Sequence, residues 1–167
     1  MKRILLWVTL SLLILGCTIP PGTVTHRSVH LFLNGEELDV YTEHYLMSET
    51  DTWISVGAFL TSIGATMIPY PYPKVACYEF LGVTFVIDRE SHLFMLEEDY
   101  AALVKQLEQD GKEVSKYTTK GQSLLQSFDG ARAEYKELER VLNECGIEIT
   151  IECDYEAKSI YVTCDQL

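Results

Sequence analysis

A helix, a glycine and two alternating strands follow one another in residues 138–164, and this order constrains the fold more than any other feature. Four apolar residues at the spacing i, i+3, i+4, i+7 form one stripe of a helix: Leu138, Val141, Leu142 and Cys145. Gly146 follows at once, where a helix end favours a residue that tolerates positive φ. Apolar and polar residues then alternate over 147–153 and again over 160–164, which is the period of strands. The segment predicts a hairpin packed on the helix before it.

The same pattern occurs earlier in the chain, offset by 82 residues. The matched residues are Trp53 with Tyr135, Val56 with Leu138, Phe59 with Val141, Leu60 with Leu142, Ile63-Gly64 with Cys145-Gly146, Met67 with Ile149, Tyr78 with Ile160 and Phe80 with Val162. Such self-similarity indicates a degenerate internal duplication. We predict an α+β fold in which antiparallel β-hairpins form a twisted sheet packed on helices. Residues 29–167 are expected to form a single domain, with copies at about 29–96 and 135–164 and a helical insertion at 97–134.

Two segments of the first copy resemble a known family. Phe-Leu-Asn-Gly-Glu-Glu-Leu at 32–38 and Thr-Trp-Ile-Ser-Val-Gly-Ala-Phe-Leu-Thr-Ser-Ile-Gly-Ala at 52–65 are similar to the copper amine oxidase N-terminal-like domain, also called a stalk domain. Residues 139–162 look like its second copy. The family's Pro-Leu-Arg is replaced by Ser55 to Gly57 in one copy and by Glu137 to Glu139 in the other. The resemblance implies the hairpin-and-helix fold and no copper, because in copper amine oxidases the metal and quinone cofactor lie in another domain.

Between the two copies, periodicity predicts further elements. Strands are expected at 75–80, 83–88 and 92–96, and a helix at 97–110 whose stripe is Tyr100, Leu103, Val104 and Leu107. Residues 123–128 form a weaker helical pattern that Asp129-Gly130 ends. The last helix is expected to begin at about Arg132, Ser55 to cap the first one, and Asn34-Gly35 to turn the first hairpin. Trp53 matches a family leucine, which implies a place in the core.

The N-terminus predicts export and attachment to lipid. A charged start precedes a twelve-residue apolar run, Ile4 to Leu15, which is typical of a secretory signal peptide and too short for a spanning helix of about 20 residues. With Gly16-Cys17 the run ends in a sequence that resembles the bacterial lipobox, and the alternatives are an ordinary signal peptide or a signal anchor. We expect residues 1–16 to be removed, Cys17 to carry lipid and 17–28 to be a tether. The protein would then lie on the extracytoplasmic face of the cell membrane.

The chain is strongly acidic, with 25 Asp and Glu against 13 Lys and Arg. Removal of residues 1–16 takes away Lys2 and Arg3 and leaves 11 basic residues, a net charge of −14. Such a balance argues against nucleic acid as a partner and fits attachment by lipid rather than by charge. The sequence lacks the Asp-x-Asp-x-Asp-Gly spacing of a calcium loop. The acidic residues are therefore interpreted as a solvated surface.

Four cysteines besides Cys17 either pair or stay free: Cys77, Cys145, Cys153 and Cys164. An exported protein is permitted disulfides, and four cysteines allow three pairings. The strand pattern places Cys77 on the face opposite Tyr78 and turns the other three towards the core. If a bridge forms, Cys145 with Cys164 is the pair expected. The alternative is free thiols that pack as small hydrophobes.

The candidate binding residues are Tyr70 and Tyr72, which alternate with prolines in the segment 69–73. The prolines predict an extended loop, and rigid exposed aromatic rings stack on sugars or anchor partners. The alternative is that the prolines only hold a connection and the tyrosines lie against the sheet.

Neither a catalytic nor a metal-binding pattern is found. The histidines lack the spacing of metal-ligand pairs, and Gly-x-Ser-x-Gly is absent. We therefore expect no cofactor, no metal and no enzyme activity. The first hypothesis is a lipid-anchored envelope protein that binds or spaces, with a cell-wall polymer or an envelope protein as partner. The second is a glycan- or solute-binding lipoprotein that uses Tyr70 and Tyr72, and the third is a small envelope hydrolase.

Overall fold

The computed structural model describes residues 29–39, 45–48, 51–72, 74–112 and 122–167. The predicted signal peptide, the lipidation site Cys17 and the tether therefore lie outside the described residues. No helix among those described is long and apolar enough to cross a membrane. In chain order the elements are β1 (His30–Leu33), β2 (Glu36–Leu38), β3 (Tyr45–Met47), β4 (Thr52–Ser55), α2 (Val56–Ser62), β5 (Thr66–Ile68), β6 (Val75–Phe80), β7 (Val83–Asp88), β8 (Leu93–Leu96), α3 (Glu97–Gln109), β9 (Arg132–Glu134), α5 (Tyr135–Glu144), β10 (Ile149–Asp154) and β11 (Ser159–Cys164).

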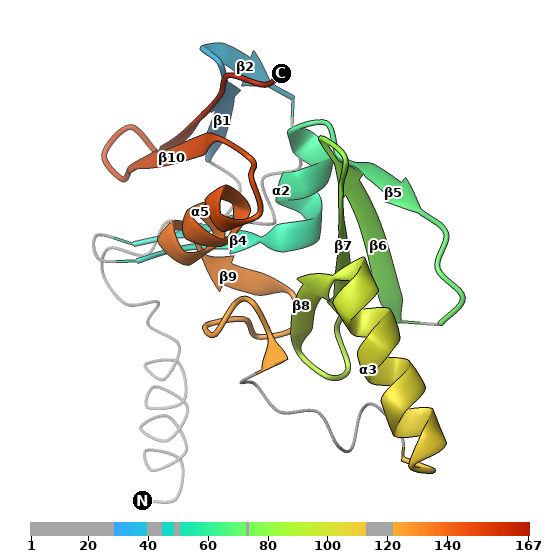
Figure 1. The fold of residues 1–167 in the computed structure, drawn as a ribbon. Helices are drawn as coiled ribbons and strands as arrows, with labels where there is room; N and C mark the ends of the chain where they lie inside the picture. Colours follow the sequence, from blue (N-terminus) through green and yellow to red (C-terminus); the bar gives the residue numbers. More distant parts are fainter. Residues whose placement is uncertain (1–28, 40–44, 49–50, 73, 113–121) are drawn as a thin grey trace, which may run out of the picture.

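The described strands are divided among three sheets (Figure 1). The strand orders are β3-β4-β9, β10-β11-β1-β2 and β5-β6-β7-β8. Every pairing is antiparallel except that of β1 with β11, which is parallel. The predicted α+β class, with hairpins packed on helices, is confirmed. The strands divide into three sheets because β4 pairs with β9 and with neither hairpin sheet.

The two helices that the sequence matches, α2 and α5, end in the same way. Gly64 after α2 has φ 101° and Gly146 after α5 has φ 84°. The amide of Ala65 donates to the carbonyl of Leu60 at 2.8 Å, and the amide of Ile147 donates to the carbonyl of Leu142 at 3.0 Å. Both bonds close the same helix-ending turn, which needs a glycine in the left-handed region. The offset of 82 residues therefore holds at this point of the fold.

The hairpins that follow differ by four residues in their pairing. Met67 pairs with Tyr78, whereas its counterpart Ile149 pairs with Cys164. Tyr78 therefore corresponds in register to Cys164, and the predicted match with Ile160 is wrong. The cause is the place where each chain turns back. Only Ile68 follows Met67 in β5, whereas five residues follow Ile149 in β10 before the turn.

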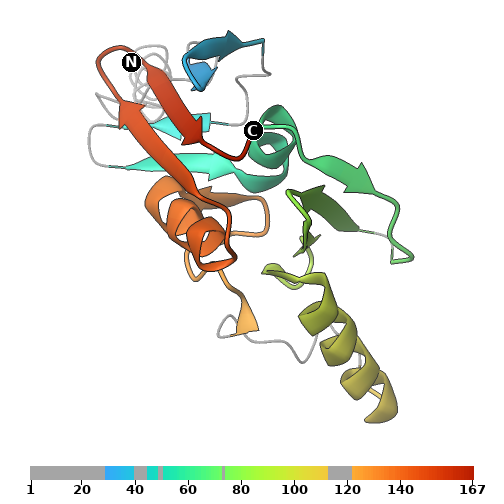
Figure 2. The same ribbon diagram turned by 45° about the horizontal axis from the view of Figure 1, so that its top comes forward.

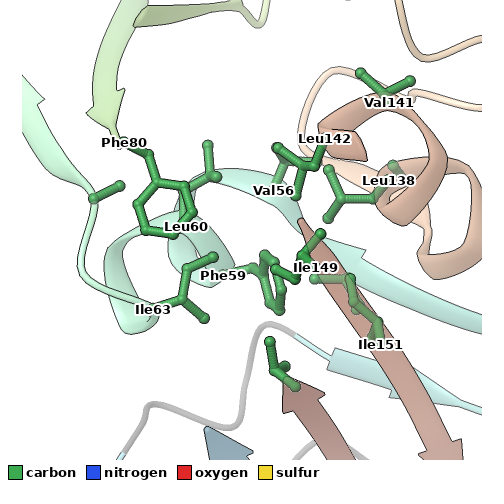
Figure 3. Packing of buried hydrophobic residues seen from close by; sticks show 14 of the residues in the cluster. Val56, Phe59, Leu60, Ile63, Phe80, Leu138, Val141, Leu142, Ile149 and Ile151 are labelled. Atoms are coloured by element: carbon green, nitrogen blue, oxygen red, sulfur yellow. The ribbon is translucent and has the colours of Figure 1, made fainter. Parts of the chain in front are cut away.

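A single cluster of buried apolar side chains is shared by both copies (Figure 3). Figure 3 shows Val56 of α2 beside Leu142 of α5, and Leu60 of α2 beside Phe80 of β6. These side chains are at most 2% exposed. Side chains of β6, β10 and β11 also belong to the cluster, together with residues of six other strands. Trp53 is half-buried and not part of it, because its side chain lies on the face of β4 opposite the buried Ile54. The prediction that Trp53 is a core residue is therefore wrong.

The inserted helix α3 covers the outer face of the β5–β8 sheet (Figures 1 and 2). Its buried residues are Tyr100, Val104 and Leu107, as the stripe predicted, and Leu103 packs at the margin. Cys77 lies beneath this helix, on the face of β6 opposite Tyr78. This sheet is consequently buried on both faces, by the shared cluster on one side and by α3 on the other.

Several local predictions differ from the structure. The Ser55 side chain makes no cap hydrogen bond to α2. The last helix begins at Tyr135, because residues 132–134 pair with β4 as the strand β9. Residues 123–128 form no helix. The hydroxyl of Ser123 accepts the amide of Phe94, and the amides of Gln126 and Ser127 donate to Glu137 instead of to a helix. The turn at Asn34-Gly35 is confirmed, with φ 49° and 87°, as a two-residue hairpin turn of this type requires.

The side chain of Glu137 on α5 binds residues 126 and 127, which precede β9. Its carboxylate accepts hydrogen bonds from the amide of Gln126 at 2.5 Å and the amide of Ser127 at 2.9 Å, and from the hydroxyl of Ser127. Burial raises the pKa of Glu137, but the hydrogen bonds from Ser127 and Gln126 and the nearby Arg140 outweigh it, so the pKa is lowered. The carboxylate is therefore charged and bonded at neutral pH.

Replacement of Glu137 by glutamine should lower the free energy of unfolding at neutral pH by about 1–3 kcal/mol, because charge-assisted bonds to the amides of Gln126 and Ser127 are lost. A lowered pKa in the folded state contributes stability above the unfolded pKa, and this contribution is lost as the pH falls through the folded pKa. Urea unfolding should thus show a wild-type-to-variant difference that shrinks in acid. Glu144→Gln on the same helix, an exposed partner of Arg140, should change little. A difference that stays constant with pH would contradict this account.

Candidate functional site

A groove of about 280 Å³ lies between α3 and the described residues 69–72, which we call the proline–tyrosine loop. Its lining residues are Tyr70, Pro71, Tyr72, Glu97, Ala101, Val104, Lys105 and Glu108. The loop brings the two tyrosines to the helix because it leaves the edge strand β5 and returns as β6, whose outer face α3 covers. Both sequence-predicted tyrosines therefore line one groove.

Tyr70 is half-buried against neighbouring rings. Its ring centroid lies 6.1 Å from that of Tyr100, edge-on, and 5.9 Å from that of Tyr72. Its hydroxyl donates to Oε1 of Glu97 at 3.5 Å. Burial, followed by the charge of Glu97, raises the pKa of Tyr70 to about 12. The phenol is therefore neutral and serves as a fixed donor and apolar wall of the groove.

Tyr72 is the exposed member of the pair, with 38% of its surface accessible. Its hydroxyl donates to Oε1 of Glu108 at 3.4 Å. Desolvation and then the charge of Glu108 raise its pKa. Glu97 and Glu108 stand at opposite ends of α3, eleven residues apart, which corresponds to about 16 Å along a helix. The two tyrosines thus hold one carboxylate at each end of the groove.

A buried network supports the wall on which Tyr70 lies. The Tyr100 hydroxyl donates to Oδ2 of Asp88 at 2.9 Å, and Asp88 is only 4% exposed. Oδ1 of Asp88 accepts the amides of Glu90 and Ser91 at 3.0 and 3.1 Å. Burial and the bond to Asp88 raise the pKa of Tyr100. Tyr100 is fixed by these bonds, so the ring against which Tyr70 packs is preorganised.

A second hollow, of about 400 Å³, lies on the other side of Glu97. It is lined by Gly82, Val83, Thr84, Leu96, Glu97, Glu98 and Cys145. These residues come from the β6–β7 turn, β7, β8, the start of α3 and the end of α5. The sequence analysis missed it, and no local pattern signals it, since it forms only where the second copy meets the first.

The four described cysteines are free thiols. Cys145 opens towards the second hollow at the end of α5, whereas Cys164 is buried on β11. The bridge considered between these two is therefore not formed in this structure. Burial raises the pKa of Cys153 to about 12 and also raises the pKa values of Cys77 and Cys145. These thiols are protonated at neutral pH, so they are poor nucleophiles.

The groove offers groups suited to recognition. Its polar groups are two phenols, two carboxylates and the ammonium group of Lys105. Carboxylates accept hydrogen bonds from hydroxyl groups, and the adjacent tyrosine rings provide a flat apolar surface at the same place. In the part of the chain that the structure describes, no three His, Cys, Asp or Glu residues gather to hold a metal ion.

No protein-family model, no curated protein and no solved structure matches this chain. The resemblance to the copper amine oxidase N-terminal-like domain therefore stays a prediction from sequence.

Proposed function

We propose that this chain is a lipid-anchored envelope protein that binds an extended ligand in the groove between the proline–tyrosine loop and α3, without catalysis. The observation that carries the proposal is the pair of tyrosine rings, each bonded to a carboxylate at one end of the same groove. The attachment to the cell membrane is inferred from the apolar run that ends in Gly16-Cys17.

A cell-wall polymer suits this groove best. Five of its eight lining residues follow α3 from Glu97 to Glu108, so the groove runs along the helix and fits an extended chain better than a compact molecule. The exposed ring of Tyr72 offers a face for stacking on a sugar, and the carboxylates of Glu97 and Glu108 are acceptors for sugar hydroxyl groups. An acidic protein carries few sites for an anionic polymer, which makes a neutral or amine-bearing glycan the expected ligand.

Substitution of Tyr72 by alanine should weaken binding to isolated cell walls about tenfold, since an anchoring aromatic at an interface contributes more than about 1 kcal/mol. Co-sedimentation of a soluble form, residues 18–167, measures the binding. Tyr161→Ala is the matched control, because Tyr161 is 39% exposed against 38% for Tyr72. Tyr161 lies on β11 and does not line the groove. Equal losses for the two variants would contradict the proposed site, and unchanged binding in both would remove it.

The anchor has a separate test. Cells that express the full-length chain should incorporate labelled palmitate into it, and the Cys17→Ser variant should carry no label, because the thiol that forms the thioether is gone. An unlabelled wild-type chain, or a labelled variant, would contradict lipid attachment at Cys17. Wall binding by the groove is measured on the soluble form and does not depend on this result.

A further inference from the structure

The edge strands of this protein differ in how open they are to pairing with another strand. At β8, the amide of Phe94 donates to the hydroxyl of Ser123 at 3.1 Å, and its carbonyl accepts the amide of Leu124 at 2.9 Å. At β10, the side-chain amide of Asn143 donates to the carbonyl of Ile149 at 2.7 Å, and its oxygen accepts the main-chain amide of Ile149 at 3.3 Å. These two edges are closed to further strands because their main-chain groups are already bonded.

Two other edges are protected by charge. The edge strand β2 carries Glu36 and Glu37, and the edge strand β9 carries Arg132 and Glu134. Charged residues on an edge strand discourage pairing with another chain.

Two edge strands, β3 and β5, carry no charged residue. In β3 the side chain of Met47 is buried, with 1% exposed. The other strand, β5, is more open. Its residues are Thr66, Met67 and Ile68, and within the described chain it pairs with β6 on one side and with no strand on the other. Met67 is 66% exposed, the highest value among the large exposed hydrophobic residues described. Figures 1 and 2 both show β5 at the outer rim of the molecule, so this edge is accessible to another chain.

The sequence around β5 selects the partner. Residues 52–73 contain no charged side chain, in a chain whose net charge is −12. Two copies of an acidic protein repel each other over most of their surfaces, and this repulsion is smallest where the contacting segment is neutral. The strand is also its own complement, because an antiparallel pair centred on Met67 places Thr66 opposite Ile68 and no like charges face each other.

We propose that two copies of this chain associate through β5, in antiparallel pairing about a two-fold axis at Met67. The pairing would join two four-stranded sheets into one of eight strands and bury both Met67 side chains against each other. Such an interface is closed by its symmetry, so it yields a dimer and not a filament. The proline–tyrosine loop follows β5 directly, so one groove would lie at each end of the paired strands.

The dimer is weak by this account, because a three-residue strand buries less area than a standard interface. Its dissociation constant is measured by light scattering of the full-length chain in detergent, over a series of concentrations. Met67→Lys should raise that constant about tenfold or more, since it places two like charges opposite each other. Leu167→Lys, at another exposed apolar residue (52%), should leave it unchanged.

A charge-swap mixture makes the test specific to this strand. Met67→Lys and Met67→Glu should each be monomeric alone and should form a heterodimer when mixed, because opposite charges then face each other. Both variants should fold as the wild type does, by circular dichroism and thermal unfolding, since the side chain is mostly exposed. A wild type that stays monomeric at every concentration overturns the proposal, as does a dimer that both variants retain.

Discussion

Replacement of Phe59 by alanine is expected to lower the free energy of unfolding by about 3–5 kcal/mol, the usual cost of removing a buried aromatic side chain. Phe59 is 0% exposed and lies between α2, α5 and the strand β10 (Figure 3). Neighbours from two helices and a sheet cannot all move in to fill the space. A loss of this size is a large share of the roughly 5–15 kcal/mol by which domains are stable.

Urea unfolding of residues 18–167 measures this loss. Trp53 is the single tryptophan of that segment, so its fluorescence reports on β4 while circular dichroism reports on the helices. The shared cluster predicts that both signals change in one transition. Leu167→Ala, at a half-exposed C-terminal position, should alter stability by less than about 0.5 kcal/mol. Two separate transitions, or a Phe59→Ala loss below about 1 kcal/mol, would contradict a core shared by both copies.

Replacement of Gly130 by alanine should cost about 2–5 kcal/mol, from two sources that add. Its φ of 96° is a left-handed conformation, which costs an alanine about 1–2 kcal/mol. A Cβ atom there would also lie 2.9 Å from the carbonyl oxygen of Arg89 and 2.9 Å from the His92 ring. The carbonyl belongs to the β7–β8 hairpin and cannot withdraw without disturbing it, so overpacking adds about 1–3 kcal/mol.

Gly64→Ala separates the two sources for Gly130. Gly64 has nearly the same φ, 101°, but a Cβ atom there would meet nothing within 4 Å. Its substitution should carry the conformational cost alone, so the Gly130 variant should unfold at a clearly lower temperature. Equal melting temperatures for the two variants would show that the segment before β9 does not approach the hairpin as closely as the structure has it.

The sequence predicted those features that local periodicity determines. The stripe of α5, the glycine after each helix and the buried residues of α3 follow from spacing and from φ preferences, and the structure confirms them. The match of Tyr78 with Ile160 was wrong, because it depends on where each hairpin turns back, and alternation along a strand does not specify that position. The parallel contact of β1 with β11 joins residues about 130 apart, and no local signal specifies it.

The candidate site was predicted only in part. Tyr70 and Tyr72 were selected because prolines flank them, but their carboxylate partners lie 27 and 36 residues further along the chain. Glu97 and Glu108 look like ordinary solvated residues of a helix, and only the packing of α3 on the sheet brings them to the loop. The loop was interpreted either as exposed binding rings or as tyrosines that lie against the protein. Tyr72 is exposed, as the first interpretation expects, whereas Tyr70 packs against Tyr100, as the second expects.

The most direct test of ligand binding in the groove is an NMR titration of isotope-labelled residues 18–167 with solubilised cell-wall fragments. The proposal predicts amide shifts that saturate and that concentrate on residues 70–72 and on α3, with the sheet around Tyr161 unaffected. Shifts that concentrate on another surface would contradict the groove as the binding site. Spectra unchanged at fragment concentrations in the millimolar range would contradict wall binding itself.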